Sequence, residues 1–451
     1  MSSDGPTPAV PLELLGDLVR RARAAGADAA DAVMFESVSL SVAQRLGKSE
    51  GIERAESRAL GLRVFHGRRQ AVASSTDTAA DALAELVERA LAMARAAPED
   101  PYCGLPDADR LATELADLEL CDDEEPAPET LVARAVAAED AARAVAGVTN
   151  SEGAEAGWSR GAVALVTSNG FAGGYASSEH SVGVSVIAGD GTAMERDYDY
   201  AAARFAADLM DPADVGRGAG ERAVRRLGPR KAPSAQVPVV YDPRVARGLL
   251  SHLAGAIAGP AVARGTSYLK DRLGEAVFAP GVTVTDDALR ARGLRSKPFD
   301  GEGVATTRRD IVADGVLTTW LLDQRSARQL GLVPTGHAAR RSSSPPSPRP
   351  TNLFLAPGST SAAELIADID QGFYVTELMG MGINAITGDY SRGAAGFWIE
   401  NGEIAHPVSE VTVAGNLKDM FRALVPADDL EFRYGIDSPT VRVDGMTVAG
   451  A

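Results

Sequence analysis

The sequence is poor in cysteine, in aromatic residues and in positive charge. Cys103 and Cys121 are the only cysteines in 451 residues, too few for a disulfide framework. Lys and Arg number 45 against 62 Asp and Glu, which gives a formal net charge of -17. Nucleic acids and anionic membranes both select basic surfaces, so this composition argues against either as a partner.

Long apolar segments are also missing. The longest, residues 248–263, contains Ser251, His252 and Pro260 and falls short of the ~20 apolar residues that cross a bilayer. The first ten residues, MSSDGPTPAV, have no basic stretch followed by an apolar one, so we expect no secretory signal. Together with the scarcity of cysteine, these features favour a cytoplasmic protein.

The first half of the chain alternates helical and strand-like patterns. Apolar spacing and composition predict helices over residues 9–26, 78–96, 129–145 and 211–227. Strands are expected over residues 32–41, 60–65, 70–75, 161–166 and 182–186. We therefore interpret this half as two helix–antiparallel-strand–helix units, residues 1–112 and 113–234.

A third region follows the turn-rich segment 228–234, which is a good domain boundary. In this region, residues 235–451, a short strand at 237–241 precedes a small-residue helix at 245–258. Strand pairs with tight turns are predicted around Asp314-Gly315 and Asn401-Gly402. The fold class is therefore α+β, with a C-terminal mixed domain rich in antiparallel β-sheet.

Residues 340–350 read RRSSSPPSPRP, a run that disfavours both helix and central strand. We expect a long exposed loop here. Loops of this length inside a compact domain are often functional.

Two short patterns could indicate stand-alone chemistry. Ser267 and Lys270 match the S-x-x-K pair of penicillin-recognising hydrolases, but the S-D-N and K-T-G motifs that complete such a site do not follow. Asp300 and Glu302 could work as an acid–base pair, or could cap a turn through local hydrogen bonds. The five histidines show no metal-ligand spacing.

Several segments of the third region, taken together, resemble the TldD/PmbA family, and specifically its TldE (PmbA) branch. The matching segments, all in the right order, are 264–267 (RGTS), 297–306 (KPFDGEGVAT), 387–398 (TGDYSRGAAGFW), 401–404 (NGEI), 407–410 (PVSE) and 414–420 (AGNLKDM).

This resemblance implies a heterodimeric zinc peptidase that degrades or trims unfolded peptides. The TldD subunit of such an enzyme carries H-E-x-x-x-H on a helix and a cysteine ligand near the C-terminus. Leu250, Ser251 and Gly255 occupy the corresponding His, Glu and His places here, and residues 431–437 contain no cysteine. We therefore expect no catalytic residue and no metal ligand in this chain, with zinc in a TldD-like partner.

The leading hypothesis is a non-catalytic TldE-like subunit that helps to enclose an extended peptide, which strand addition can hold without regard to sequence. The segment 340–352 would form one wall of that chamber. Candidate residues for contact with peptide or partner are His252, Asp300, Glu302, His337, Arg340, Arg341, Asn352 and Asp389. The alternatives are a homodimeric peptide-binding protein without catalysis, and a stand-alone hydrolase using Ser267/Lys270 or Asp300/Glu302.

Overall fold

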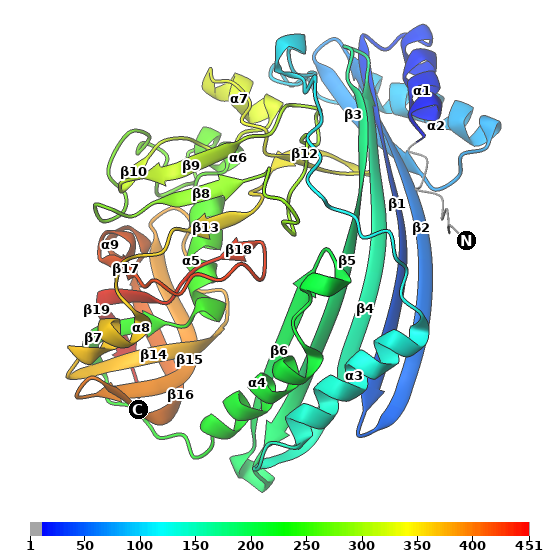
Figure 1. Ribbon diagram of the computed structural model, residues 1–451. Coiled ribbons are helices and arrows are strands. Elements are labelled where there is room, and N and C mark those ends of the chain that lie inside the picture. Colours follow the sequence, from blue (N-terminus) through cyan, green and yellow to red (C-terminus); the bar gives the residue numbers. More distant parts are fainter. Residues whose placement is uncertain (1–10, 451) are drawn as a thin grey trace.

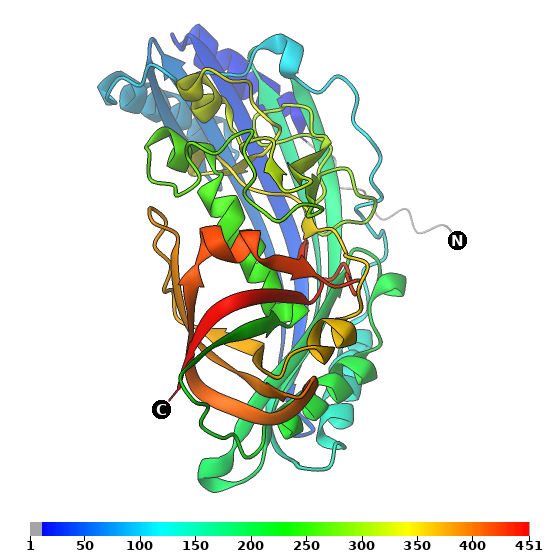
Figure 2. The ribbon, with the colours of Figure 1, turned by 90° about the vertical axis from the view of Figure 1, so that its left-hand side faces the viewer.

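The computed structural model describes residues 11–450 and confirms the α+β fold class. A long, twisted antiparallel sheet forms the N-terminal half, and helices cover one of its faces (Figure 1). The C-terminal half lies against the other face, as the view turned by 90° also shows (Figure 2). The site described below lies where the two halves meet.

The N-terminal sheet has the strand order β3-β2-β1-β4-β5-β6. Its strands are β1 (Ala29–Arg45), β2 (Lys48–His66), β3 (Arg69–Ser75), β4 (Val148–Thr167), β5 (Ala172–Ala188) and β6 (Glu195–Ala203). β4 has 20 residues and spans roughly 65 Å at ~3.3 Å per residue. Each predicted helix–strand–helix unit supplies three strands, and β1 pairs with β4 along most of its length. The two units thus share one continuous sheet.

Side-chain alternation along β1 assigns its two faces. Ala30, Met34 and Leu40 pack beneath the helices, whereas Val33 and Phe35 face the C-terminal half. The covering helices are α1 (Leu12–Ala24), α2 (Ala80–Ala96), α3 (Pro128–Arg143) and α4 (Pro212–Arg225). α1 and α2 cover one end of the sheet, and α3 and α4 cover the other (Figure 1).

The C-terminal half is built around a second six-stranded sheet, in the order β16-β15-β14-β7-β19-β17. Its strands are β7 (Ala235–Tyr241), β14 (Gln371–Met379), β15 (Asp389–Glu400), β16 (Glu403–Asn416), β17 (Leu424–Pro426) and β19 (Val441–Ala449). An additional pairing between β16 and β19 closes five of these strands into a ring.

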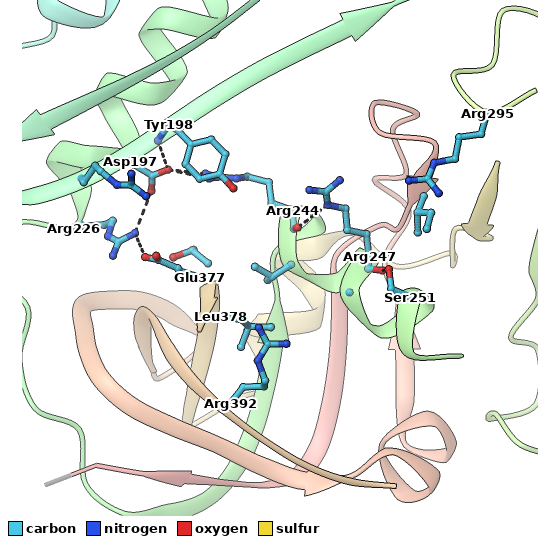
Figure 3. Close-up of a pocket in the computed structure, with 15 residues that line it drawn as sticks. Asp197, Tyr198, Arg226, Arg244, Arg247, Ser251, Arg295, Glu377, Leu378 and Arg392 are labelled. Atoms are coloured by element: carbon cyan, nitrogen blue, oxygen red, sulfur yellow. Dashed lines mark hydrogen bonds and ion pairs between the residues drawn. The ribbon is translucent and has the colours of Figure 1, made fainter. Parts of the chain in front are cut away.

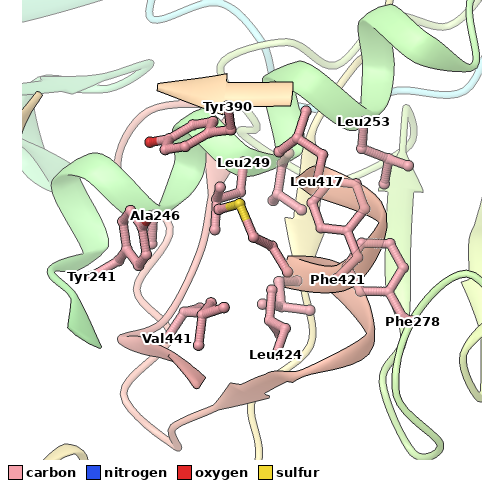
Figure 4. Packing of buried hydrophobic residues seen from close by; sticks show 14 of the residues in the cluster. Tyr241, Ala246, Leu249, Leu253, Phe278, Tyr390, Leu417, Phe421, Leu424 and Val441 are labelled. Atoms are coloured by element: carbon pink, nitrogen blue, oxygen red, sulfur yellow. The ribbon is translucent and has the colours of Figure 1, made fainter. Parts of the chain in front are cut away.

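A smaller five-stranded sheet and several short helices complete this half. The sheet consists of β8 (Val284–Asp287), β9 (Arg308–Ala313), β10 (Val316–Leu317), β13 (Leu353–Leu355) and β18 (Ile436–Asp437). The helices are α5 (Pro243–Ala256), α6 (Gly259–Ala263), α7 (Gln324–Leu330), α8 (Ala362–Ala367) and α9 (Leu417–Arg422). Apolar side chains of α5, including Leu249 and Leu253, pack against Leu417 and Phe421 of α9 (Figure 4).

The prediction of a long exposed loop over residues 340–350 is wrong. The segment forms a two-stranded hairpin, β11 (Ala338–Arg341) and β12 (Ser344–Pro348). Prolines are tolerated because a two-stranded ribbon leaves many N–H groups without a ladder partner. The hairpin tip lies against β2, where a Cβ on Gly61 would come within 2.3 Å of the Ser342 carbonyl oxygen. Glycine is required at position 61 for this close approach.

Candidate functional site

A groove runs along the exposed face of α5, between the two halves of the molecule. Its first part is a cavity of about 500 Å³ with walls from β6, α5, β14 and β15 (Figure 3). An adjoining cavity of about 490 Å³ shares Ser251, Arg295 and Ile436 with the first and continues to the β12 end at Arg349. We call the two cavities together the α5 groove.

The helical period of α5 decides which of its side chains reach the groove. Asp242 caps the helix by accepting a hydrogen bond from the Arg244 N–H at 3.0 Å, and Pro243 takes the first helical position. Arg244, Arg247 and Ser251 follow at spacings of three and four and line the groove. The opposite face carries buried aliphatic residues such as Leu250.

Six arginines and only two carboxylates line the first cavity. Both carboxylates are already paired: Asp197 lies 3.0 Å from Arg244, and Glu377 lies 2.5 Å from Arg226 (Figure 3). Burial opposes the charge of Arg244, but the adjacent Asp197 raises its pKa overall. This end of the cavity is therefore electrically balanced.

Of the other arginines of the groove, Arg196 pairs with Glu152 at 3.2 Å, and four have no such partner among the described residues. Within residues 11–450, no carboxylate forms an ion pair with Arg247, Arg295, Arg349 or Arg392. The Arg247 guanidinium lies 4.1 Å from the centre of the Tyr434 ring, a cation–π contact that holds its plane in place. The groove therefore has an excess of positive charge with free N–H donors, which suits an anionic ligand.

The positions that correspond to the H-E-x-x-x-H residues of the resembling family lie on α5 beside this groove. Leu250 is buried in the core, whereas Ser251 and Gly255 are exposed along the groove. None of the three offers an imidazole, carboxylate or thiolate, so these residues do not fit a zinc ion. Across residues 11–450, no three His, Cys, Asp or Glu side chains are grouped so that they could hold a metal.

Asp300 and Glu302 are buried at the junction of the two halves and act as hydrogen-bond acceptors. Asp300 accepts from the N–H groups of Glu302 at 2.8 Å and Val304 at 3.0 Å, which is the turn-capping role. Glu302 accepts from the Arg63 guanidinium at 3.2 Å and from the Gln324 N–H at 2.8 Å. Burial raises the pKa of Glu302 to about 7, against the opposing charge of Arg63.

The Arg340 side chain is also buried and forms an ion pair with Asp31 of β1. Arg63 donates to the same carboxylate at 2.8 Å. Arg63 and Arg340 thus bridge the N-terminal sheet to the C-terminal half through Asp31 and Glu302. The prediction that Arg340 contacts peptide or partner does not agree with this position, because its buried guanidinium is already paired with Asp31.

His337 and Asn352 are buried as well, next to β8 of the smaller sheet in the C-terminal half. The His337 ring lies 2.8 Å from the Thr335 hydroxyl and 3.3 Å from the Asp286 carboxylate. Asn352 donates to the Asp287 carbonyl at 2.7 Å. These hydrogen bonds within the chain give both residues a structural role, and their contact with peptide or partner stays a prediction.

The remaining three candidates reach the surface at different places. Arg341 is exposed on the β11–β12 hairpin, and Asp389 is exposed at the start of β15, where it accepts from Thr387 at 2.6 Å. His252 is half-buried on α5 in an edge contact with Tyr390. Burial lowers the pKa of His252 to about 4, and the charge of Arg392 adds to the shift. Their contact with peptide or partner stays a prediction.

The structure gives Ser267 a structural role. Its side chain is buried, and its hydroxyl donates to the Ala256 carbonyl at 2.6 Å, where α5 ends. Lys270 is exposed, with no hydrogen bond to the Ser267 hydroxyl among the described residues. The pair therefore lacks an accessible nucleophile next to a base, which hydrolysis would need.

The sequence interpretation missed the arginines of the groove. Arg244 and Arg247 carried a weak signal, because they lie on the same helix face as Ser251. Arg295 and Arg392 carried none, since they come from segments far apart in the chain and meet α5 only in the folded structure.

Three family models match the chain in order along its length. They describe PmbA/TldA metallopeptidase domain 1 (residues 30–94), central domain (121–227) and C-terminal domain (234–450). The sequence is 42% identical to "Metalloprotease PmbA" of Escherichia coli O157:H7, over 94% of this chain and 92% of that protein. The chain belongs to the PmbA/TldD family, on its PmbA branch.

Solved structures share the fold of this chain. A crystal structure of a Bacteroides thetaiotaomicron protein is 28% identical, with a TM-score of 0.89 over 97% of this chain and 98% of that one. TldE from Thermococcus kodakarensis has the same fold at 21% identity, with a TM-score of 0.85 over 97% of this chain and all of the other. In this PmbA-branch chain, no helix of residues 11–450 is both long and apolar enough to cross a membrane.

Proposed function

We propose that this chain is the non-catalytic subunit of a two-chain zinc peptidase, paired with a TldD-like subunit that supplies the metal. The observation that carries the proposal is the chemistry of α5. Leu250 packs into the core, and Ser251 and Gly255 face the groove without a single metal-binding atom of the kind that zinc prefers. Membership in a family of metallopeptidases indicates that the substrate of the pair is a peptide.

In such an assembly the partner's zinc would polarise the scissile carbonyl and supply hydroxide. This chain would contribute binding surface. The N-terminal sheet ends in β3 and β6, which are edge strands, and an extended peptide or a partner strand can add to an edge through backbone hydrogen bonds.

Reconstitution tests the proposal. The chain is co-expressed with a TldD-like subunit, and native mass spectrometry reads the stoichiometry and the metal content together. We expect a heterodimer with zinc in the partner only, and cleavage of an unstructured peptide that requires both chains. A partner variant without its zinc ligands is the control and should pair without cleaving. Stoichiometric zinc in the isolated chain, together with cleavage by that chain alone, would refute the proposal. A mass equal to two copies of this chain, unchanged when the partner is present, would favour the homodimeric alternative.

A further inference from the structure

We propose that the α5 groove binds the carboxylates of an acidic, extended peptide, with Arg247, Arg295 and Arg349 as the carboxylate-binding side chains. The inference rests on the proposed function, because it names the class of peptide that the two-chain enzyme takes. The groove lies beside Leu250, Ser251 and Gly255 of α5, which lack the side chains of the H-E-x-x-x-H motif.

The groove differs in charge from the rest of the molecule. The chain as a whole has a formal charge of -17, yet six of the 15 residues that line the first cavity are arginines. In an acidic protein, a concave surface of opposite sign concentrates field lines and draws in anions. A polyanion such as nucleic acid would meet repulsion from the surrounding surface, whereas a short acidic peptide can enter the groove.

Three arginines of the groove, Arg247, Arg295 and Arg349, lie near one another without a direct ion pair in the part of the chain that the structure describes. The nearby carboxylates, Asp437 and Asp286, accept hydrogen bonds from backbone N–H groups of the chain. Burial lowers the pKa of Arg295, and the positive charges of Arg247 and Arg349 lower it further, although the nearby Asp437 and Asp286 oppose part of this shift. Like charges held together raise the energy of the unliganded groove. A bound carboxylate would relieve this repulsion, so part of its binding free energy comes from the arrangement of the arginines.

The donors of the groove also have a geometry that suits carboxylates. Guanidinium groups are planar forks that match the two oxygens of a carboxylate, and Arg247 is held in plane by its contact with Tyr434. Leu378, Val245 and Ile436 add apolar surface between the charged groups. The two cavities adjoin at Ser251, so an extended ligand can contact both at once.

Fluorescence anisotropy of the purified full chain tests the inference with short labelled peptides of Glu, Gly and Ser. Each peptide is paired with a version in which Gln replaces Glu, and each is made with a free and with an amidated C-terminus. We expect the Glu peptide to bind at least about tenfold more tightly than its Gln counterpart, and affinity to fall as salt rises. If binding were lost on amidation of the C-terminus rather than on replacement of Glu by Gln, the groove would bind the C-terminal carboxylate and not the side-chain carboxylates.

Substitutions in the groove locate the binding. We expect R247Q, R295Q and R349Q each to weaken binding of the Glu peptide by about three- to tenfold, since each removes one partly exposed charge-assisted contact. R247K keeps the charge without the fork and should fall between R247Q and the wild type. R20Q, on the exposed surface of α1, is the matched control and should bind like the wild type. Thermal unfolding of every variant shows that the fold is intact.

Equal affinity for Glu and Gln peptides, or full binding by folded R247Q and R295Q variants, would overturn the inference. This failure differs from failure of the proposed function. If the chain pairs with the zinc subunit but binds peptides regardless of their charge, the proposed function holds and the proposal for the groove is refuted. If the chain binds acidic peptides through these arginines but never pairs with a zinc subunit, the proposal for the groove holds and the proposed function is refuted.

Discussion

Substitution of Glu302 by Gln should change how stability depends on pH. Glu302 lies fully buried between the two halves, and burial raises its pKa to about 7 from its ordinary value of 4.5. The folded chain therefore holds a proton that the unfolded chain releases. Its contribution to stability is fully present below pH 4.5 and is lost as the pH rises through 7.

The expected magnitude follows from the shift. A shift of one unit corresponds to 1.36 kcal/mol, so the contribution of Glu302 to the free energy of unfolding falls by about 2–3 kcal/mol between pH 5 and pH 8. The amide of E302Q keeps the shape of the side chain but does not titrate. Relative to the wild type, E302Q should therefore gain about 2–3 kcal/mol over this interval, whatever its absolute stability at pH 5.

Urea unfolding at pH 5, 6, 7 and 8 measures this difference. Tryptophan fluorescence and circular dichroism followed together show whether both halves unfold in one transition. E88Q, at an exposed position on α2, is the matched control and should follow the wild-type profile. If the stability of E302Q relative to the wild type stayed constant between pH 5 and pH 8, or fell toward pH 8, Glu302 would be ionised throughout and the reasoning would be refuted.

Three further predictions address the hairpin contact, the end of α5 and the groove. G61V should cost about 1–3 kcal/mol in urea unfolding, because its side chain would collide with the hairpin tip, whereas G51V on the same strand has open space and should cost little. S267A should lower stability by about 1–2 kcal/mol, because it removes the hydroxyl that donates to the Ala256 carbonyl and accepts from the Leu269 N–H. Peptide cleavage by the reconstituted pair should stay at the wild-type rate, and a loss of cleavage would support a nucleophilic role. NMR titration of His252 should show a midpoint below pH 5. The R392Q variant should move this midpoint upward, because the substitution removes a nearby positive charge. An unchanged midpoint would show that Arg392 lies too far from His252 to affect its pKa.

Local patterns in the sequence predicted the fold where local physics decides it. The helix expected at 245–258 is observed as α5, and the turns at Asp314-Gly315 and Asn401-Gly402 join strand pairs as expected. The backbone φ is positive at both residues of each turn, a conformation that Gly, Asn and Asp adopt most readily. The turn residues alone therefore predict each strand pair. The strand at 60–65 is also correct, but it is only the apolar end of β2.

The predictions failed where distant contacts decide the structure. Residues 48–58 of β2 are largely polar and exposed, and they form a strand only because β1 pairs with them. The proline-rich hairpin at 340–350 forms against Gly61, nearly three hundred residues earlier in the chain. In the groove, Arg247 and Arg295 meet through the tertiary fold alone. No periodicity relates them, so no reading of the sequence could have paired them.

The closed ring of the C-terminal half has a consequence for how the chain can be made. β19 is the last strand in chain order, and it pairs with β7, β16 and β17. While a nascent chain still lacks residues 441–449, β7 and β16 each present an unsatisfied edge, and such edges invite pairing with other chains. Loss of these few residues should therefore give an aggregating product rather than a slightly shorter protein.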